Sequence, residues 1–125
     1  MMPLPRVLLV VPGLIAGLCI PALTASPKAA PEGTIGMTNT DFGQSVVTLH
    51  KGERLNFVND SHVVHVIGPG KAGHIVSPEA GVPITGFHLM PTNSVYTSPP
   101  WRSTGTFWLT CSVHTTMTIK VVVTP

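Results

Sequence analysis

The chain has 125 residues, of which 43% are hydrophobic and 10% are charged, so it is too short for two ordinary domains and too apolar to be disordered. Its 13 prolines and 12 glycines interrupt regular elements and favour short strands joined by turns, which predicts a single all-β domain. A net charge of +2 leaves no basic surface to neutralise a phosphate backbone, so no nucleic-acid partner is expected.

The first 25 residues have the order of a secretory signal peptide. Arg6 is followed by an apolar run over residues 7–18 and then by small residues that end at Ala25. We expect cleavage after Ala25, and positions between residues 22 and 30 also fit the pattern. The sequence therefore predicts an exported protein that is periplasmic, extracellular or associated with the cell envelope.

Two alternatives keep this segment on the mature protein. Residues 7–25 are nearly long enough to span a bilayer, but two prolines and two glycines interrupt them. Acylation of Cys19 fits less well, because the bulky Leu18 stands where a small residue is expected. Contact with a membrane is thus expected only if the N-terminal segment is retained.

A flexible lead-in is expected over residues 26–38, with a first edge strand near its end, and the folded domain over residues 39–125. Residues 45–50 and 54–58 are β-branched, alternating segments on either side of a turn at Gly52, which predicts a β-hairpin.

Further strands follow after a polar break at residues 59–61. Residues 62–67 alternate as a strand, and residues 71–104 read as loops with one or two short strands. The clearest strands are residues 105–111 and 117–123.

Removal of the signal peptide leaves Cys111 as the single cysteine, so no internal disulfide can form. It lies in the spacing Cys111-x2-His114-x2-Met117, between two predicted strands. A loop this tight gathers a thiolate, an imidazole and a thioether, which belong to the donor set of a trigonal copper site with two histidines, one cysteine and a weak axial methionine. Calcium and magnesium would prefer oxygen ligands.

The second imidazole has to come from elsewhere in the chain. His65 and His62 lie on opposite faces of the predicted strand, so both cannot serve. We favour His65, because it lies in the apolar body of the strand, whereas His62 adjoins the polar break.

On these residues the chain resembles the small cupredoxins related to plastocyanins and amicyanins, over residues 44–67 and 105–125. The resemblance implies a Greek-key β-sandwich with one copper ion (Cu⁺/Cu²⁺) per chain, and a mobile, monomeric electron carrier that meets redox partners transiently. The implied ligands are His65, Cys111, His114 and Met117.

Two positions in the C-terminal half depart from the pattern. Val113 stands where amicyanins have proline, and Ile119 stands where many relatives have glycine. Neither departure removes a ligand, but both bear on the rigidity of the loop.

An enzyme is not expected. A dinuclear copper centre needs two bridging cysteines, and a catalytic copper needs an exchangeable position, which a methionine ligand would occupy. Carriage or storage of copper stays open as the alternative to electron transfer. His50, His74 and His88 read as surface residues, with a weak indication that His88 and Met90 could hold Cu(I).

Overall fold

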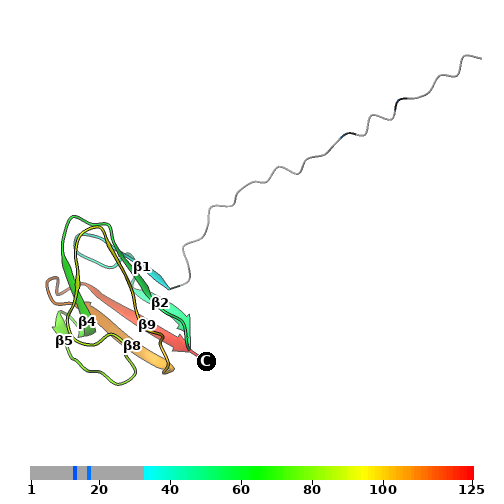
Figure 1. The fold of residues 1–125 in the computed structure, drawn as a ribbon. Coiled ribbons are helices and arrows are strands. Elements are labelled where there is room, and N and C mark those ends of the chain that lie inside the picture. Colours follow the sequence, from blue (N-terminus) through cyan, green and yellow to red (C-terminus); the bar gives the residue numbers. More distant parts are fainter. Residues whose placement is uncertain (1–12, 14–16, 18–32) are drawn as a thin grey trace, which may run out of the picture.

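The structure is a computed structural model that describes residues 33–125 together with the isolated Gly13 and Gly17. The predicted signal peptide, residues 1–25, otherwise lies outside the described residues. Within the described part the chain forms nine strands and no helix (Figure 1), which confirms the all-β prediction. No described helix could therefore cross a membrane.

The strands form two sheets. The smaller sheet has the order β1-β3-β7, with β1 parallel to β3 and β7 antiparallel to it. Its strands are β1 (Thr34–Met37), β3 (Asn56–Asn59) and β7 (Ser94–Thr97).

The larger sheet has the order β2-β9-β8-β4-β5, and β6 also pairs with β4. Figure 1 shows β2, β9, β8 and β4 side by side in one layer. Its strands are β2 (Val46–His50), β4 (His65–Lys71), β5 (His74–Ile75), β6 (His88–Met90), β8 (Gly105–Cys111) and β9 (Thr118–Thr124).

Alternation of side chains builds one core between the two sheets. Along β9, every second residue from Ile119 to Val123 is buried, and the residues between them are half-buried. Ile35 and Phe57 of the smaller sheet join them in a single apolar cluster, and Leu109 of β8 joins from the larger sheet. Burial of apolar area in this cluster is the main favourable term that holds the sheets together.

The predicted hairpin is wrong, because its two strands belong to different sheets. The turn itself forms, with the Glu53 amide donating to the His50 carbonyl at 3.0 Å. Beyond the turn, however, the buried Leu55 donates its amide to the Ser98 hydroxyl instead of to β2. β2 then pairs with β9 in parallel, and β3 pairs with β1 and β7. A turn sequence specifies only that the chain reverses its direction. Which strands then pair depends on which apolar faces meet across the core.

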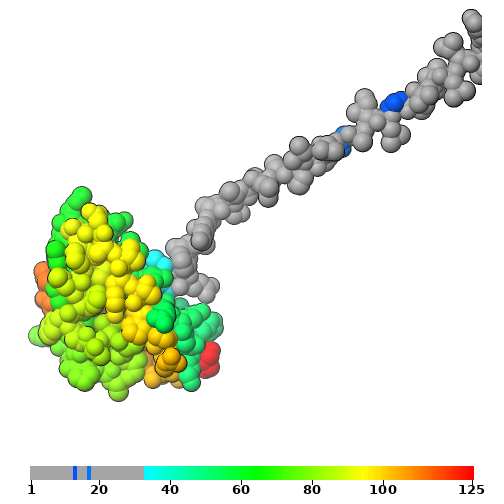
Figure 2. All heavy atoms as spheres, in the orientation of Figure 1, coloured from blue at the N-terminus to red at the C-terminus, as the bar shows by residue number. Residues whose placement is uncertain are grey.

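A strand forms near the end of residues 26–38, where the sequence led us to expect a first edge strand. β1 lies inside the segment expected as a lead-in, at the edge of the smaller sheet, and its register sets Ile35 opposite Phe57. Between residues 71 and 104 there are three short strands, β5, β6 and β7, where one or two were expected. Figure 2 shows this segment, coloured green to yellow, over the near face of the molecule.

The two tryptophans occupy contrasting environments. Trp101 is fully buried, donates Nε1–H to the Ser98 hydroxyl at 3.2 Å and lies 5.6 Å from Phe107 between ring centroids. Trp108 is half-buried, with Lys71 Nζ 4.3 Å from the centroid of its ring.

We expect Trp101→Ala to lower the free energy of unfolding by about 3–5 kcal/mol, because it removes a large buried side chain and leaves a cavity. Trp108→Ala is the matched control and should cost clearly less. Urea unfolding of the metal-free protein measures both. Equal losses for the two variants would contradict the assignment of Trp101 to the core.

Candidate metal centre

Three potential metal ligands meet at one end of the larger sheet. His65 opens β4, Cys111 ends β8, and His114 lies in the loop that follows β8. One nitrogen of each imidazole and the Cys111 Sγ all lie within 4.8 Å of one another. Cys111 Sγ is 3.7 Å from His65 Nδ1 and 3.8 Å from His114 Nδ1.

These separations fit three donors around one ion. With metal–nitrogen and metal–sulfur distances of about 2.05 and 2.3 Å, a trigonal site sets nitrogen and sulfur about 3.8 Å apart, and a tetrahedral site about 3.6 Å. The observed 3.7 and 3.8 Å lie within this range and fit either arrangement. The three donors are thus close enough together to bind one metal ion.

The orientation of the His65 ring is fixed from its far side. His65 Nε2 lies 2.9 Å from the Thr38 carbonyl oxygen, to which it donates its proton. Nδ1 then carries the free lone pair and faces Cys111. A backbone carbonyl that orients a ligating histidine in this way is a common support for metal sites.

Burial also favours the neutral form of this imidazole, which is the form that binds metal. The pKa of His65 is lowered chiefly because burial removes water from the ring, and the charge of His114 adds to the lowering. The hydrogen bond to the Thr38 carbonyl acts in the opposite direction, but burial has the larger effect.

The segment before β4 separates His65 from His62. Asn59 Nδ2 donates to the Val63 carbonyl at 2.9 Å, and the Ser61 hydroxyl contacts the same oxygen at 3.1 Å. Because side chains bind the backbone there, the strand begins at His65 and not at residue 62. His62 is exposed and stands outside the cluster, whereas His65 is fully buried within it.

The thiol of Cys111 is buried and receives a backbone donor. The Val66 amide lies 3.5 Å from Sγ, and the Cys111 amide itself donates to the Met117 carbonyl at 3.0 Å. An N–H group directed at the sulfur is a common support for a metal-binding cysteine.

The loop after Cys111 returns the chain to β9 at Met117. The Met117 amide donates to the His114 carbonyl at 3.0 Å, which closes a turn inside the loop. Met117 is fully buried and His114 is half-buried. The structure thus places Met117 at the end of the loop that carries His114, and its role as a ligand stays a prediction.

Solved structures of other proteins share this architecture. A purple cupredoxin from Nitrosopumilus maritimus matches with a TM-score of 0.60 and 16% identity, over 74% of this chain and 99% of that one. Amicyanin from Paracoccus versutus matches with a TM-score of 0.60 and 21% identity, over 80% of this chain and 86% of that one. The chain has the cupredoxin fold.

A further match is an amicyanin mutant in its reduced Cu(I) form, with a TM-score of 0.59 and 17% identity, over 77% of this chain and 85% of that one. No protein-family model and no curated protein matches the sequence. At these identities the likeness establishes the cupredoxin β-sandwich, and chemistry has to be argued from the residues of this chain.

The other histidines of the cupredoxin domain stand apart from the cluster. His74 is exposed on β5, and His50 Nδ1 contacts the Thr124 hydroxyl at 2.9 Å. His88 stacks on Tyr96 with 3.6 Å between ring centroids. Met90 is buried opposite His65 in the β4–β6 pairing.

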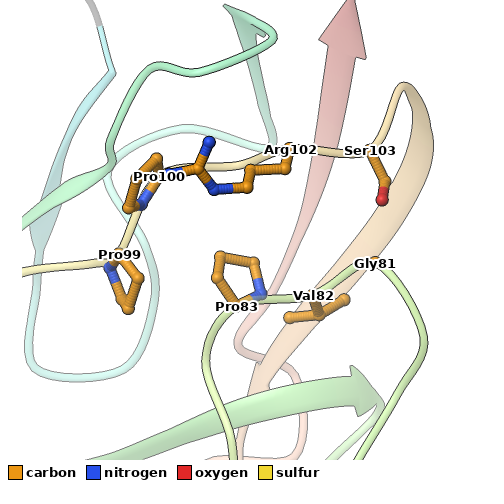
Figure 3. A pocket seen from close by; sticks show the side chains of 7 residues that line it. All are labelled: Gly81, Val82, Pro83, Pro99, Pro100, Arg102 and Ser103. Carbon is orange, nitrogen blue, oxygen red and sulfur yellow. The ribbon is translucent and has the colours of Figure 1, made fainter.

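An open cleft lies among the loops, with a volume of about 350 Å³. Figure 3 shows Pro83 and Arg102 on opposite sides of it. None of the proposed ligands lines it.

Sequence reasoning missed the supporting residues. Thr38, Asn59 and Ser61 hold His65 or the segment before it, yet residues 59–61 read only as a polar break. An asparagine and a serine just before a strand that carries a histidine were the available signal. Thr38 gave no such signal, because it contacts His65 through its backbone carbonyl and lies 27 residues before His65 in the chain.

The stacked His88 should make the stability of the metal-free domain depend on pH. Burial lowers the pKa of His88, so the folded state disfavours its protonated form, whereas the unfolded chain takes up the proton near pH 6.5. The stabilising effect is present above about pH 6.5 and is lost as the pH falls through the lowered pKa.

We therefore expect His88→Gln to lose less stability than the parent between about pH 7.5 and about pH 5, by urea unfolding. His74→Gln, which removes an exposed imidazole, is the control and should behave as the parent. An equal loss of stability in His88→Gln and in the parent would show that His88 does not contribute to the pH dependence.

Proposed function

We propose that the protein is an exported, one-electron carrier that holds one copper ion per chain and is not an enzyme. The proposed ligands are His65, Cys111, His114 and Met117. The observation that supports this most is the close grouping of one thiol sulfur and two imidazole nitrogens, with a buried methionine in the loop that carries His114. That donor set is typical of mononuclear copper sites that transfer electrons.

The donors favour copper over other metals. Thiolate and thioether are soft ligands that stabilise Cu(I), and imidazole suits both oxidation states. Zinc sites are built from cysteine, histidine or carboxylate in tetrahedral sets, and calcium takes oxygen ligands. A buried methionine beside one thiol and two imidazoles fits neither description and favours copper, because a thioether is a ligand for Cu(I).

Electron transfer is favoured over copper carriage by how firmly the protein holds the donors. The Thr38 carbonyl fixes the His65 ring, and the Val66 amide contacts the Cys111 sulfur. Ligands held in one arrangement need little movement when the metal changes oxidation state. A protein that hands over its metal would instead need ligands that open readily.

The half-buried His114 is the proposed route for electrons, because it is the least buried of the three clustered residues. Its neighbour Val113 is 57% exposed, which provides an apolar surface for brief contact with a redox partner. Residues 33–125 carry five cationic and four acidic side chains, so strong electrostatic steering of that partner is not expected.

The proposal predicts one tightly bound copper per chain, an intense visible thiolate-to-Cu(II) band and reversible redox cycling with retention of the metal. Copper analysis, absorption spectroscopy and voltammetry test it, and Cys111→Ser should abolish the band. A Cys111→Ser variant that keeps the intense visible band would refute the assignment of Cys111 as a copper ligand. Ready loss of Cu(I) to a chelator during cycling would favour carriage instead.

His65 and His62 offer a matched pair of variants. His65→Ala should lose copper or its characteristic spectrum, because it removes a clustered imidazole, while His62→Ala should leave both nearly unchanged. Copper titration monitored by visible absorption compares them. The reverse pattern would show that His62 is the second imidazole ligand.

A further inference from the structure

A buried hydroxyl links the end of the candidate ligand loop to a neighbouring turn. Thr110 precedes Cys111 on β8 and is fully buried on the opposite face of the strand. Its hydroxyl donates to the Met117 carbonyl at 2.9 Å and accepts the Gly73 amide at 2.9 Å. Thr110 thus connects β8, the return of the loop and the turn between β4 and β5.

The turn between β4 and β5 packs directly on the loop. The Ala72 amide donates to the Thr118 hydroxyl at 3.1 Å, beside the Thr110 hydroxyl. Gly73 has a φ of +81°, and a Cβ added there would lie 2.9 Å from Thr115 Cγ2. Only glycine allows so close an approach with this backbone conformation.

The loop has few restraints of its own. Residues 112–116 contain no proline, and Val113, Thr115 and Thr116 are exposed. The Met117 carbonyl accepts the Cys111 amide and the Thr110 hydroxyl. Of these two donors, only the hydroxyl also bonds to the β4–β5 turn.

We infer that Thr110 is a positioning residue for Met117, and that the β4–β5 turn supports the ligand loop through it. The inference rests on the proposed copper site, in which Met117 is the weak axial ligand. The axial ligand tunes the reduction potential of such a site, so a small displacement of Met117 alters the potential while two imidazoles and the thiolate still hold the metal.

Three variants isolate the hydroxyl. Thr110→Val keeps the size of the side chain and removes the contacts of its hydroxyl with Met117, Gly73 and Thr118, and Thr110→Ser keeps the hydroxyl. Thr118→Val is the matched control, since it removes a neighbouring hydroxyl that contacts the Thr110 hydroxyl and the Ala72 amide but not the Met117 carbonyl. The readouts are copper affinity, the visible spectrum and the reduction potential of the loaded protein, and amide hydrogen exchange at Gly73 in the metal-free protein.

Thr110→Val should bind copper about 10- to 100-fold more weakly, with a changed visible spectrum and a shifted potential. The Gly73 amide should exchange faster in the same variant without metal. Thr110→Ser and Thr118→Val should both stay close to the parent in spectrum and potential. An unchanged spectrum and potential in Thr110→Val, or an equal change in Thr118→Val, would overturn the inference.

If Thr110→Val does not fold, Gly73→Ala tests the same support from the side of the turn, because its Cβ would push against Thr115 while Thr110 stays in place. A parental spectrum and potential in Gly73→Ala would then overturn the inference. A parent that takes up no copper refutes the proposed function alone. In that case unaltered Gly73 exchange in a folded Thr110→Val variant would overturn the role of the turn as well.

Discussion

The register between β4 and β8 is the constraint on which the candidate metal centre depends. Ile67 lies directly opposite Cys111, so His65, two residues earlier on β4, shares the face of the sheet that carries the thiol. A slip of one residue in this pairing would turn His65 to the other face. The buried Ile67 opposes such a slip, because it lies on the same face of β4 as His65 and would leave the core with it. Packing of the sandwich thereby fixes the distance between two proposed ligands.

Buried hydrogen bonds fix the position of the segment that precedes His65. Asn59 is fully buried, and its amide nitrogen lies within 3.0 Å of the carbonyls of Val63, Met90 and Pro91. Its Oδ1 accepts the Ser61 hydroxyl at 2.6 Å. Buried polar groups are costly when unpaired, and a satisfied network favours one arrangement of the chain. Asn59 thus ties the segment before His65 to the end of β6, and the imidazole starts from a fixed backbone.

The sequence was most informative where the determining contacts are local. The spacing of Cys111, His114 and Met117 encodes a tight loop between two strands, and β8 has the predicted bounds. The apolar residues around His65 singled it out over His62, although the strand begins three residues later than expected. Both predictions depend on the pattern within a few residues, which a single sequence displays.

The sequence did not show which strands pair when they lie far apart in the chain. The turn at Gly52 looked like the centre of a hairpin, yet β2 and β3 pair in different sheets. The Thr38 carbonyl that orients His65 and the Gly73 amide that reaches Thr110 are backbone groups, for which no residue type gives a signal. Such contacts arise only once the strand order is set, so a single sequence indicates the proposed ligands better than the groups that position them.

The four proposed ligands are supported in two different ways, and this division bears on how the site could be tuned. His65 and Cys111 belong to paired strands of the core, so moving either would disturb the packing of the sandwich. His114 and Met117 belong to the loop after β8, in which Met117 is buried in the core cluster and His114 is half-buried. Only the loop residues Val113, Thr115 and Thr116 are exposed. Substitutions at these exposed positions would therefore disturb the packing of the sandwich less than substitutions at His65, Cys111 or Met117.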